Sequence, residues 1–208
     1  MRLAVILPSR GLVFSRTIAE VLREARGVGC EWELFMAHSR PIPECFNEPI
    51  AEGMAWGASH FWLVEEDMAL PPGILAELVA SGAPIAAADY PVKPGIMCVN
   101  RDASGLVRHT GTGCLFAERA ALEAALPFST DWWFIITDGG MTWTRRRVSE
   151  SARDLIYGMH DVDFGMRLYE LGRPIHVIDT LAGQRRVVRP AIERRNTEGW
   201  HDIEEMWS

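Results

Sequence analysis

Long apolar segments are absent from this sequence of 208 residues. The first apolar run, Leu3 to Leu7, ends at Pro8 and has no cleavage signature of small residues, so it suits neither a membrane span nor a signal peptide. With 48% hydrophobic and 24% charged residues, the composition is that of a globular chain with a buried core. We therefore expect a cytoplasmic protein without a transmembrane segment.

Cysteine is scarce and irregularly spaced. The four cysteines are Cys30, Cys45, Cys98 and Cys114. Their spacing matches neither paired CxxC zinc geometry nor the dense framework of a small secreted domain. We expect reduced, buried thiols.

Several catalytic signatures are also missing. The sequence contains no phosphate-binding loop ending in Gly-Lys-Ser/Thr, no GxSxG and no HExxH. The segment Gly111-Thr112-Gly113 lacks the spacing and the position of a dinucleotide-binding fingerprint. These absences argue against ATPases, serine hydrolases and dehydrogenases.

Acidic side chains outnumber basic ones by 28 to 21, which gives a net charge of −7. Such a charge repels a polyanion unless positive charge gathers locally. It gathers between residues 183 and 195, in Arg185, Arg186, Arg189, Arg194 and Arg195, and together with Arg145, Arg146 and Arg147 these arginines could form a local positive surface. Two interpretations stay open, a solvated arginine face or contact with the phosphates of a nucleotide or a larger anionic acceptor.

The first half of the chain alternates strand-like and helix-like segments, which is typical of βαβ units around a mostly parallel sheet. Strands are predicted over 3–7, 32–37, 61–64 and 84–88, and helices over 15–25, 47–59 and 73–80. We expect Ser15 to cap the first of these helices. Further on, strands are predicted over 106–108, 114–116 and 175–178, and helices over 118–126 and 161–171.

No regular element is predicted from Pro127 to Tyr157. This segment contains Trp132, Trp133 and Trp143. Long loops of this kind are usually functional. Tryptophan faces stack on sugar rings or unpaired bases, and neighbouring arginines suit an acceptor that carries phosphate. The alternative is that these tryptophans belong to a lid or to the core.

An acidic cluster, Glu65, Glu66 and Asp67, follows the predicted third strand. In an open α/β sheet, ligands bind beyond the carboxyl ends of the strands. Carboxylates suit Mg²⁺ or Mn²⁺, which take one or two of them together with substrate phosphates. We expect Glu65 and Asp67 to address one side and Glu66 to turn away, unless the cluster is only a solvated turn.

A second polar cluster, His160, Asp161 and Asp163, opens the last predicted helix. A carboxylate there either caps the backbone amides or serves as a general base toward a hydroxyl group. The residues alone leave both roles open.

Taken in order, these segments resemble glycosyltransferases of the GT-A superfamily over about residues 2–182. The motifs that carry the resemblance are Pro8-Ser9-Arg10-Gly11, Phe61 to Met68, Ala88 to Lys93, Gly111 to Phe116 and His160 to Gly165. The resemblance implies an α/β, Rossmann-like three-layer sandwich with a central, mostly parallel sheet. It also implies one domain, with a nucleotide-sugar-binding half (about 1–95), an acceptor-side half (about 96–182) and a C-terminal tail (183–208).

The resemblance further assigns roles to residues. A UDP- or GDP-sugar would bind through Pro8, Ser9, Arg10, Gly11, Glu65, Glu66, Asp67, Arg185 and Arg186. Asp67 and Glu65 would hold Mn²⁺ or Mg²⁺ with Gln184, which stands where family members often have a histidine. Asp161 would be the base of an inverting transfer. The acceptor would contact Gly111, Thr112, Gly113, Trp132, Trp133, His160 and Asp163.

The Gln-x-x-Arg-Trp signature of processive sugar polymerases is missing, since Gln184 is followed by Arg185, Arg186 and Val187. Transfer of a single sugar is therefore expected, to a glycan, a small molecule or a modified base in DNA. Two alternatives stay open. One is a nucleotidyltransferase of related fold, and the other is a catalytically silent module that binds a nucleotide sugar or a carbohydrate.

Overall fold

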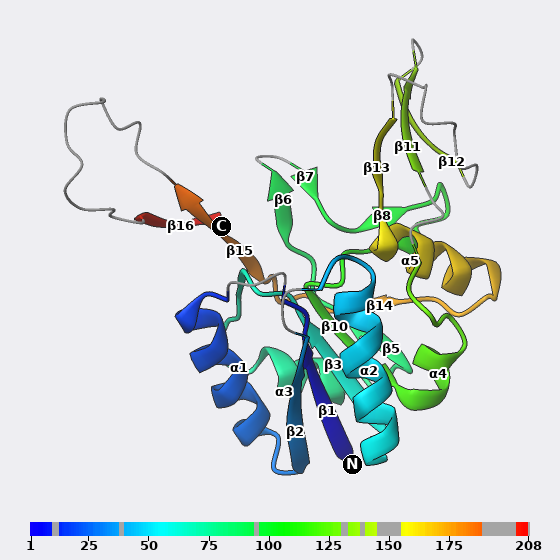
Figure 1. Cartoon of the computed structure of the whole chain (residues 1–208). Coiled ribbons are helices and arrows are strands. Elements are labelled where there is room, and N and C mark those ends of the chain that lie inside the picture. Colours follow the sequence, from blue (N-terminus) through cyan, green and yellow to red (C-terminus); the bar gives the residue numbers. More distant parts are fainter. Residues whose placement is uncertain are drawn as a thin grey trace, which may run out of the picture.

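The structure is a computed structural model that describes residues 1–9, 13–37, 40–93, 96–129, 133–137, 140–144, 155–188 and 203–207. A six-stranded sheet with the strand order β14-β5-β10-β3-β1-β2 forms its centre (Figure 1). The strands are β1 (Arg2–Leu7), β2 (Glu31–Met36), β3 (His60–Val64), β5 (Ile85–Ala87), β10 (Cys114–Glu118) and β14 (His176–Val177).

Five of these strands run in one direction, and β10 runs antiparallel to its neighbours β3 and β5. The carboxyl ends of β1, β3 and β5 therefore lie at the same edge of the sheet as the beginning of β10. This edge is where an α/β sheet places its ligands.

Helices cover both faces of the sheet, which makes three layers (Figure 1). They are α1 (Ser15–Gly27), α2 (Glu44–Trp56), α3 (Ile74–Ala80), α4 (Arg119–Glu123) and α5 (His160–Glu170). Apolar residues of α1 and α3 share one core cluster, and those of α2, α4 and α5 share the other. The α/β sandwich with a mostly parallel sheet is thus confirmed.

Strand β1 shows why the sequence folds this way. Leu3, Val5 and Leu7 enter one core cluster, while Ala4 and Ile6 enter the other. Successive side chains of a strand point to opposite faces, so a strand covered on both sides needs an unbroken apolar run. All five residues are fully buried.

Smaller sheets lie beyond the edge at which β1 ends (Figure 1). Their strands are β4 (Met68–Ala69), β6 (Pro91–Lys93), β7 (Ile96–Met97), β8 (Asn100–Arg101), β9 (Val107–His109), β11 (Trp133–Thr137), β12 (Gly140–Thr144), β13 (Leu155–Gly158), β15 (Gly183–Val188) and β16 (Ile203–Trp207). One sheet has the order β12-β11-β13 and another the order β16-β15-β4, while β6 pairs with β7 and β8 with β9.

Several local expectations need correction. Ser15 is the first residue of α1, whose N-cap is Phe14, and no side chain caps it. Helix α2 begins at Glu44 and accommodates Pro49 in its interior. It ends before Gly57, whose φ of 85° is the left-handed conformation that stops helices. The segment from Pro127 to Tyr157, expected to be a loop, contains the strands β11, β12 and part of β13.

Within the part of the chain that the structure describes, each helix is too short or too polar to cross a lipid bilayer.

Candidate functional site

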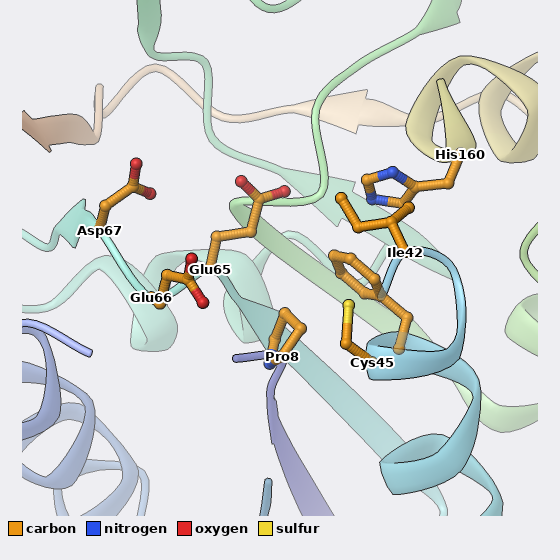
Figure 2. A pocket seen from close by; sticks show the side chains of 8 residues that line it. Pro8, Ile42, Cys45, Glu65, Glu66, Asp67 and His160 are labelled. Atoms are coloured by element: carbon orange, nitrogen blue, oxygen red, sulfur yellow. The ribbon is translucent and has the colours of Figure 1, made fainter. Parts of the chain in front are cut away.

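A pocket opens at the sheet edge where β1 and β3 end, between the acidic segment and the start of α2 (Figure 2). Its lining residues are Pro8, Ile42, Cys45, Phe46, Glu65, Glu66, Asp67 and His160. The cavity volume is about 90 Å³, whereas pockets for small molecules usually measure about 300 to 1,000 Å³. The pocket alone is therefore smaller than the usual site for a small molecule, and a larger ligand would extend along the open edge of the sheet.

Three consecutive carboxylates, those of Glu65, Glu66 and Asp67, form one wall of the pocket (Figure 2). The expectation that Glu66 turns away relied on the alternation of a strand. Strand β3 ends at Val64, and the acidic residues continue as a turn between β3 and β4. A turn does not keep the alternation, so all three carboxylates line the pocket.

Asp67 is held by the beginning of β15. The side-chain amide of Gln184 donates from Nε2 to Oδ2 of Asp67 at 3.0 Å, and the backbone N–H of Arg185 donates to the carbonyl of Asp67. The pairing of Gln184 with Met68 in the β15–β4 ladder sets this register. Gln184 thus lies next to Asp67 and presents to it its NH₂ group rather than a ligand oxygen.

The structure does not bring Arg185 into the pocket. Its side chain is 1% exposed and forms an ion pair with Glu20 at 2.6 Å. The same guanidinium donates to the hydroxyl of Thr17 at 3.0 Å and to the carbonyl of Met68. Arg185 therefore fastens β15 to α1. The neighbouring Arg186 lies in β15, and its side chain is outside the described part of the structure.

Thr112 connects the acidic wall to the opposite side of the pocket. Its hydroxyl donates to Oε1 of Glu65 at 2.7 Å and lies 3.1 Å from Nε2 of His160. These three residues come from the turn after β3, the turn before β10 and the first position of α5. The fold thus joins two clusters that are almost a hundred positions apart in the sequence.

Gly111 and Gly113 have a packing role beside Thr112. The N–H of Gly113 donates to the hydroxyl of Tyr90 at 3.1 Å. A Cβ atom on Gly111 would lie 2.0 Å from that hydroxyl oxygen, and a Cβ on Gly113 would lie 2.6 Å from the sulfur of Met68. Glycine fits here because these side chains pack directly against the backbone. Burial, with the charge of Glu65 as a second cause, raises the pKa of Tyr90 well above its usual value, so this phenol stays protonated.

The three polar residues at the start of α5 have different surroundings. His160 lies in the pocket wall, with its ring 4.3 Å from that of Phe46. Asp161 is partly exposed and accepts the N–H of Val162 at 2.8 Å. Asp163 is buried, accepts from Ser129 at 2.7 Å and pairs with Arg167 at 2.5 Å. Asp163 therefore binds its own neighbours rather than facing the pocket.

Of the expected residues at the end of β1, Pro8 lines the pocket and Ser9 is buried beside it. Arg10, Gly11 and Trp132 lie outside the described residues, as do Arg145 to Arg147 and residues 189–195. Trp133 begins β11, and its side chain is outside the described part.

Sequence reasoning did not select the apolar wall formed by Ile42, Cys45 and Phe46. The sequence did contain a signal for this wall. Because α2 follows β2 directly, the helix begins at the edge of the sheet where the strands end. Asn47 fixes this wall, because its side-chain amide donates to the carbonyl of Phe128 at 3.0 Å and accepts the N–H of Phe128 at 2.8 Å.

All four cysteines are free thiols, and three of them are buried. Burial is the main cause that raises the pKa of Cys98 and of Cys114 to about 12. These groups stay protonated, so they are unsuited to nucleophilic chemistry or to binding metal as thiolates.

Metal binding by protein groups alone is not indicated in the described part of the chain. There, no group of three or more His, Cys, Asp or Glu side chains is arranged to hold a metal ion. Glu65 and Asp67 do offer carboxylate oxygens on one wall of the pocket. This donor set fits Mg²⁺ or Mn²⁺ bound jointly by one or two carboxylates and substrate phosphates.

Comparisons with known proteins bear on the fold. No family model matches the chain, and no curated protein matches it. A solved structure described as A197 from STIV is 14% identical over 90% of this chain and 86% of that chain, with a TM-score of 0.52. Another, a nucleoside-diphosphate-sugar pyrophosphorylase from Vibrio cholerae RC9, is 13% identical over 86% of this chain and 73% of that chain, with a TM-score of 0.40.

The shared feature is the fold. At 14% identity, the likeness to A197 extends to the arrangement of strands and helices, and it agrees with the sandwich described above. The TM-score of 0.40 for the pyrophosphorylase is too low to support an argument. Conclusions on activity therefore depend on the pocket itself.

Proposed function

We propose that this protein is a glycosyltransferase of the GT-A type, which moves one sugar from a UDP- or GDP-sugar to an acceptor hydroxyl. The observation that carries the proposal is the acidic wall at the carboxyl end of β3. Glu65, Glu66 and Asp67 all line the pocket, and His160 faces them from α5. Three carboxylates in one pocket repel a bare diphosphate, so the pocket suits this ligand only together with a divalent cation.

In the proposed complex, Asp67 and Glu65 would hold Mn²⁺ or Mg²⁺, which would supply positive charge for the diphosphate. Gln184 and Thr112 orient these two carboxylates through the hydrogen bonds at 3.0 Å and 2.7 Å. Pro8 lines the side of the pocket toward the nucleotide. Glu66 adds negative charge to the same wall.

The proposal places the general base at the start of α5, on Asp161 or on His160. An inverting transfer requires a group that takes the proton of the acceptor hydroxyl on the face opposite the leaving diphosphate. The acceptor then lies on the side of Thr112 and the smaller sheets. It is a glycan, a small molecule or a modified base in DNA.

Turnover of a panel of UDP- and GDP-sugars with Mn²⁺ or Mg²⁺ tests the proposal, because each alternative has its own product. A glycosyltransferase transfers the sugar or slowly hydrolyses the donor. A nucleotidyltransferase instead releases pyrophosphate from a nucleoside triphosphate and a sugar phosphate. Binding of a donor without any turnover would indicate a silent binding module and would contradict the proposal.

A further inference from the structure

Thr112 occupies an unusual position for a buried hydroxyl, because it lies between a carboxylate and an imidazole. Its side chain is fully buried. Its oxygen is 2.7 Å from Oε1 of Glu65 and 3.1 Å from Nε2 of His160. Both partners line the pocket, while Thr112 lies behind them.

The chemistry of Glu65, Thr112 and His160 fixes the direction of the two hydrogen bonds that join them. A carboxylate oxygen only accepts hydrogen bonds, and a threonine hydroxyl has a single hydrogen to donate. Since Thr112 donates to Glu65, it accepts from His160, and Nε2 must carry the hydrogen. In a neutral imidazole the other nitrogen is then the proton acceptor. The tautomer of His160 is thus set from the acidic wall.

The hydrogen-bonded bridge from Glu65 through Thr112 to His160 is held firmly at its centre, Thr112. The N–H of Glu65 donates to the carbonyl of Gly113 at 3.2 Å, so the two turns are joined directly through their backbones. The hydroxyl of Tyr90 accepts the N–H of Gly113 and fills the space under Gly111. Thr112 therefore cannot leave Glu65 without moving this packed region.

The imidazole at the end of the bridge is also fixed. His160 is 8% exposed, and its ring lies against the rings of Phe46 and Phe128, at 4.3 Å and 5.7 Å between centroids. Figure 2 shows it beside Ile42 on the side of the pocket that faces the carboxylates. Asp161, in contrast, accepts a backbone N–H of its own helix and is absent from the lining of the pocket.

We propose that His160 is the general base of this site and that Thr112 is its positioning residue, which holds the ring with the hydrogen on Nε2. This inference rests on the proposed transfer reaction. In that step the acceptor O–H bond breaks and its proton moves to Nδ1 of His160. The oxygen forms a bond to the anomeric carbon of the nucleotide sugar, and the bond from that carbon to the diphosphate breaks, with its electron pair leaving on the diphosphate.

The tautomer is measurable without any turnover. In protein labelled with ¹⁵N in its six histidines, the His160 signals are those lost in a His160→Gln variant. At pH 8 we expect Nε2 to be protonated and Nδ1 unprotonated. In Thr112→Val, which keeps the shape but removes the hydroxyl, the share of the form protonated on Nε2 should decrease, and Thr112→Ser should retain it. An unprotonated Nε2, or a ring protonated on both nitrogens, would overturn the inference even if the protein transfers sugars.

Kinetics provide the second readout. Removing a group that orients a reacting residue typically costs about 10- to 100-fold. We expect Thr112→Val to lower kcat by that factor with little change in KM for the donor, Thr112→Ser to restore kcat, and His160→Gln to lower kcat by about 10² to 10⁴. A Thr112→Val variant with normal folding and normal kcat would overturn the positioning role. Failure of the wild type to turn over any donor would instead count against the proposed function.

Discussion

Replacing Asp67 by asparagine removes one charge from the acidic wall while keeping an acceptor for Gln184 and for the N–H of Arg185. The asparagine side-chain oxygen still accepts from Nε2 of Gln184, which now lies 3.0 Å from Oδ2. The backbone carbonyl still accepts the N–H of Arg185. We expect the free energy of unfolding to change by no more than about 1 kcal/mol, the difference between a charged and a neutral hydrogen bond.

The effect on the proposed reaction should be much larger. Two unit charges about 4 Å apart interact by about 4 kcal/mol at an effective dielectric constant of about 20, which corresponds to about a thousandfold. If Asp67 binds the cation that carries the diphosphate, Asp67→Asn should lower kcat/KM for the donor by about 10² to 10³. Excess Mn²⁺ should restore part of this loss.

The assay is donor turnover at several Mn²⁺ concentrations, accompanied by urea unfolding of each variant. Glu52→Gln is the matched control, since Glu52 is an exposed residue of α2 and its removal changes the net charge equally. Turnover by Asp67→Asn within about threefold of the control would refute the role of Asp67.

Three further predictions concern the stability of the folded protein. Glu20→Ala removes the ion-pair partner of the buried guanidinium of Arg185. We expect the free energy of unfolding, measured with urea, to decrease by about 2 to 4 kcal/mol. A decrease below about 0.5 kcal/mol would show that the ion pair is not needed for stability. In Gly165→Ala the new Cβ would lie 2.5 Å from Cβ of His109, whereas a Cβ on Gly27 would have no atom within 4 Å. Gly165→Ala should therefore lower the free energy of unfolding by about 1 to 3 kcal/mol, and Gly27→Ala should not lower it. A calorimetric measurement that gives the opposite order would contradict this prediction. Burial lowers the pKa of His109, so the unfolded chain takes up this proton first as the pH falls, and stability should decrease below about pH 6.5. Equal pH dependence of urea unfolding in the wild type and in His109→Asn would contradict this assignment.

The fold was largely accessible from the sequence because its signals are local. The run Leu3 to Leu7 and the acidic end of the third strand determine where β1 and β3 lie and which edge bears the carboxylates. The strand β11 had a signal too, since Trp133 to Thr137 is a run of aromatic and β-branched residues, which favour strands. The surrounding Asp, Gly and Arg residues obscured it.

The parts of the site that sequence reasoning could not supply are contacts over long separations. Arg185 was one of several arginines in a basic segment, and only the position of β15 beside α1 shows that its charge is neutralised by Glu20. The link from Glu65 through Thr112 to His160 depends on the antiparallel placement of β10 beside β3. No spacing pattern in the sequence indicates either contact.

The measurement that tests the central claim most directly is a crystal structure of the protein with UDP or GDP and Mn²⁺. Anomalous scattering locates the manganese without reference to the expected site. The account predicts Mn²⁺ bound to a carboxylate oxygen of Asp67 at about 2.0 to 2.6 Å and to the diphosphate, with the nucleotide running toward Pro8. A diphosphate bound away from the Glu65–Asp67 wall, or a wall that stays without metal while the nucleotide binds elsewhere, would contradict it.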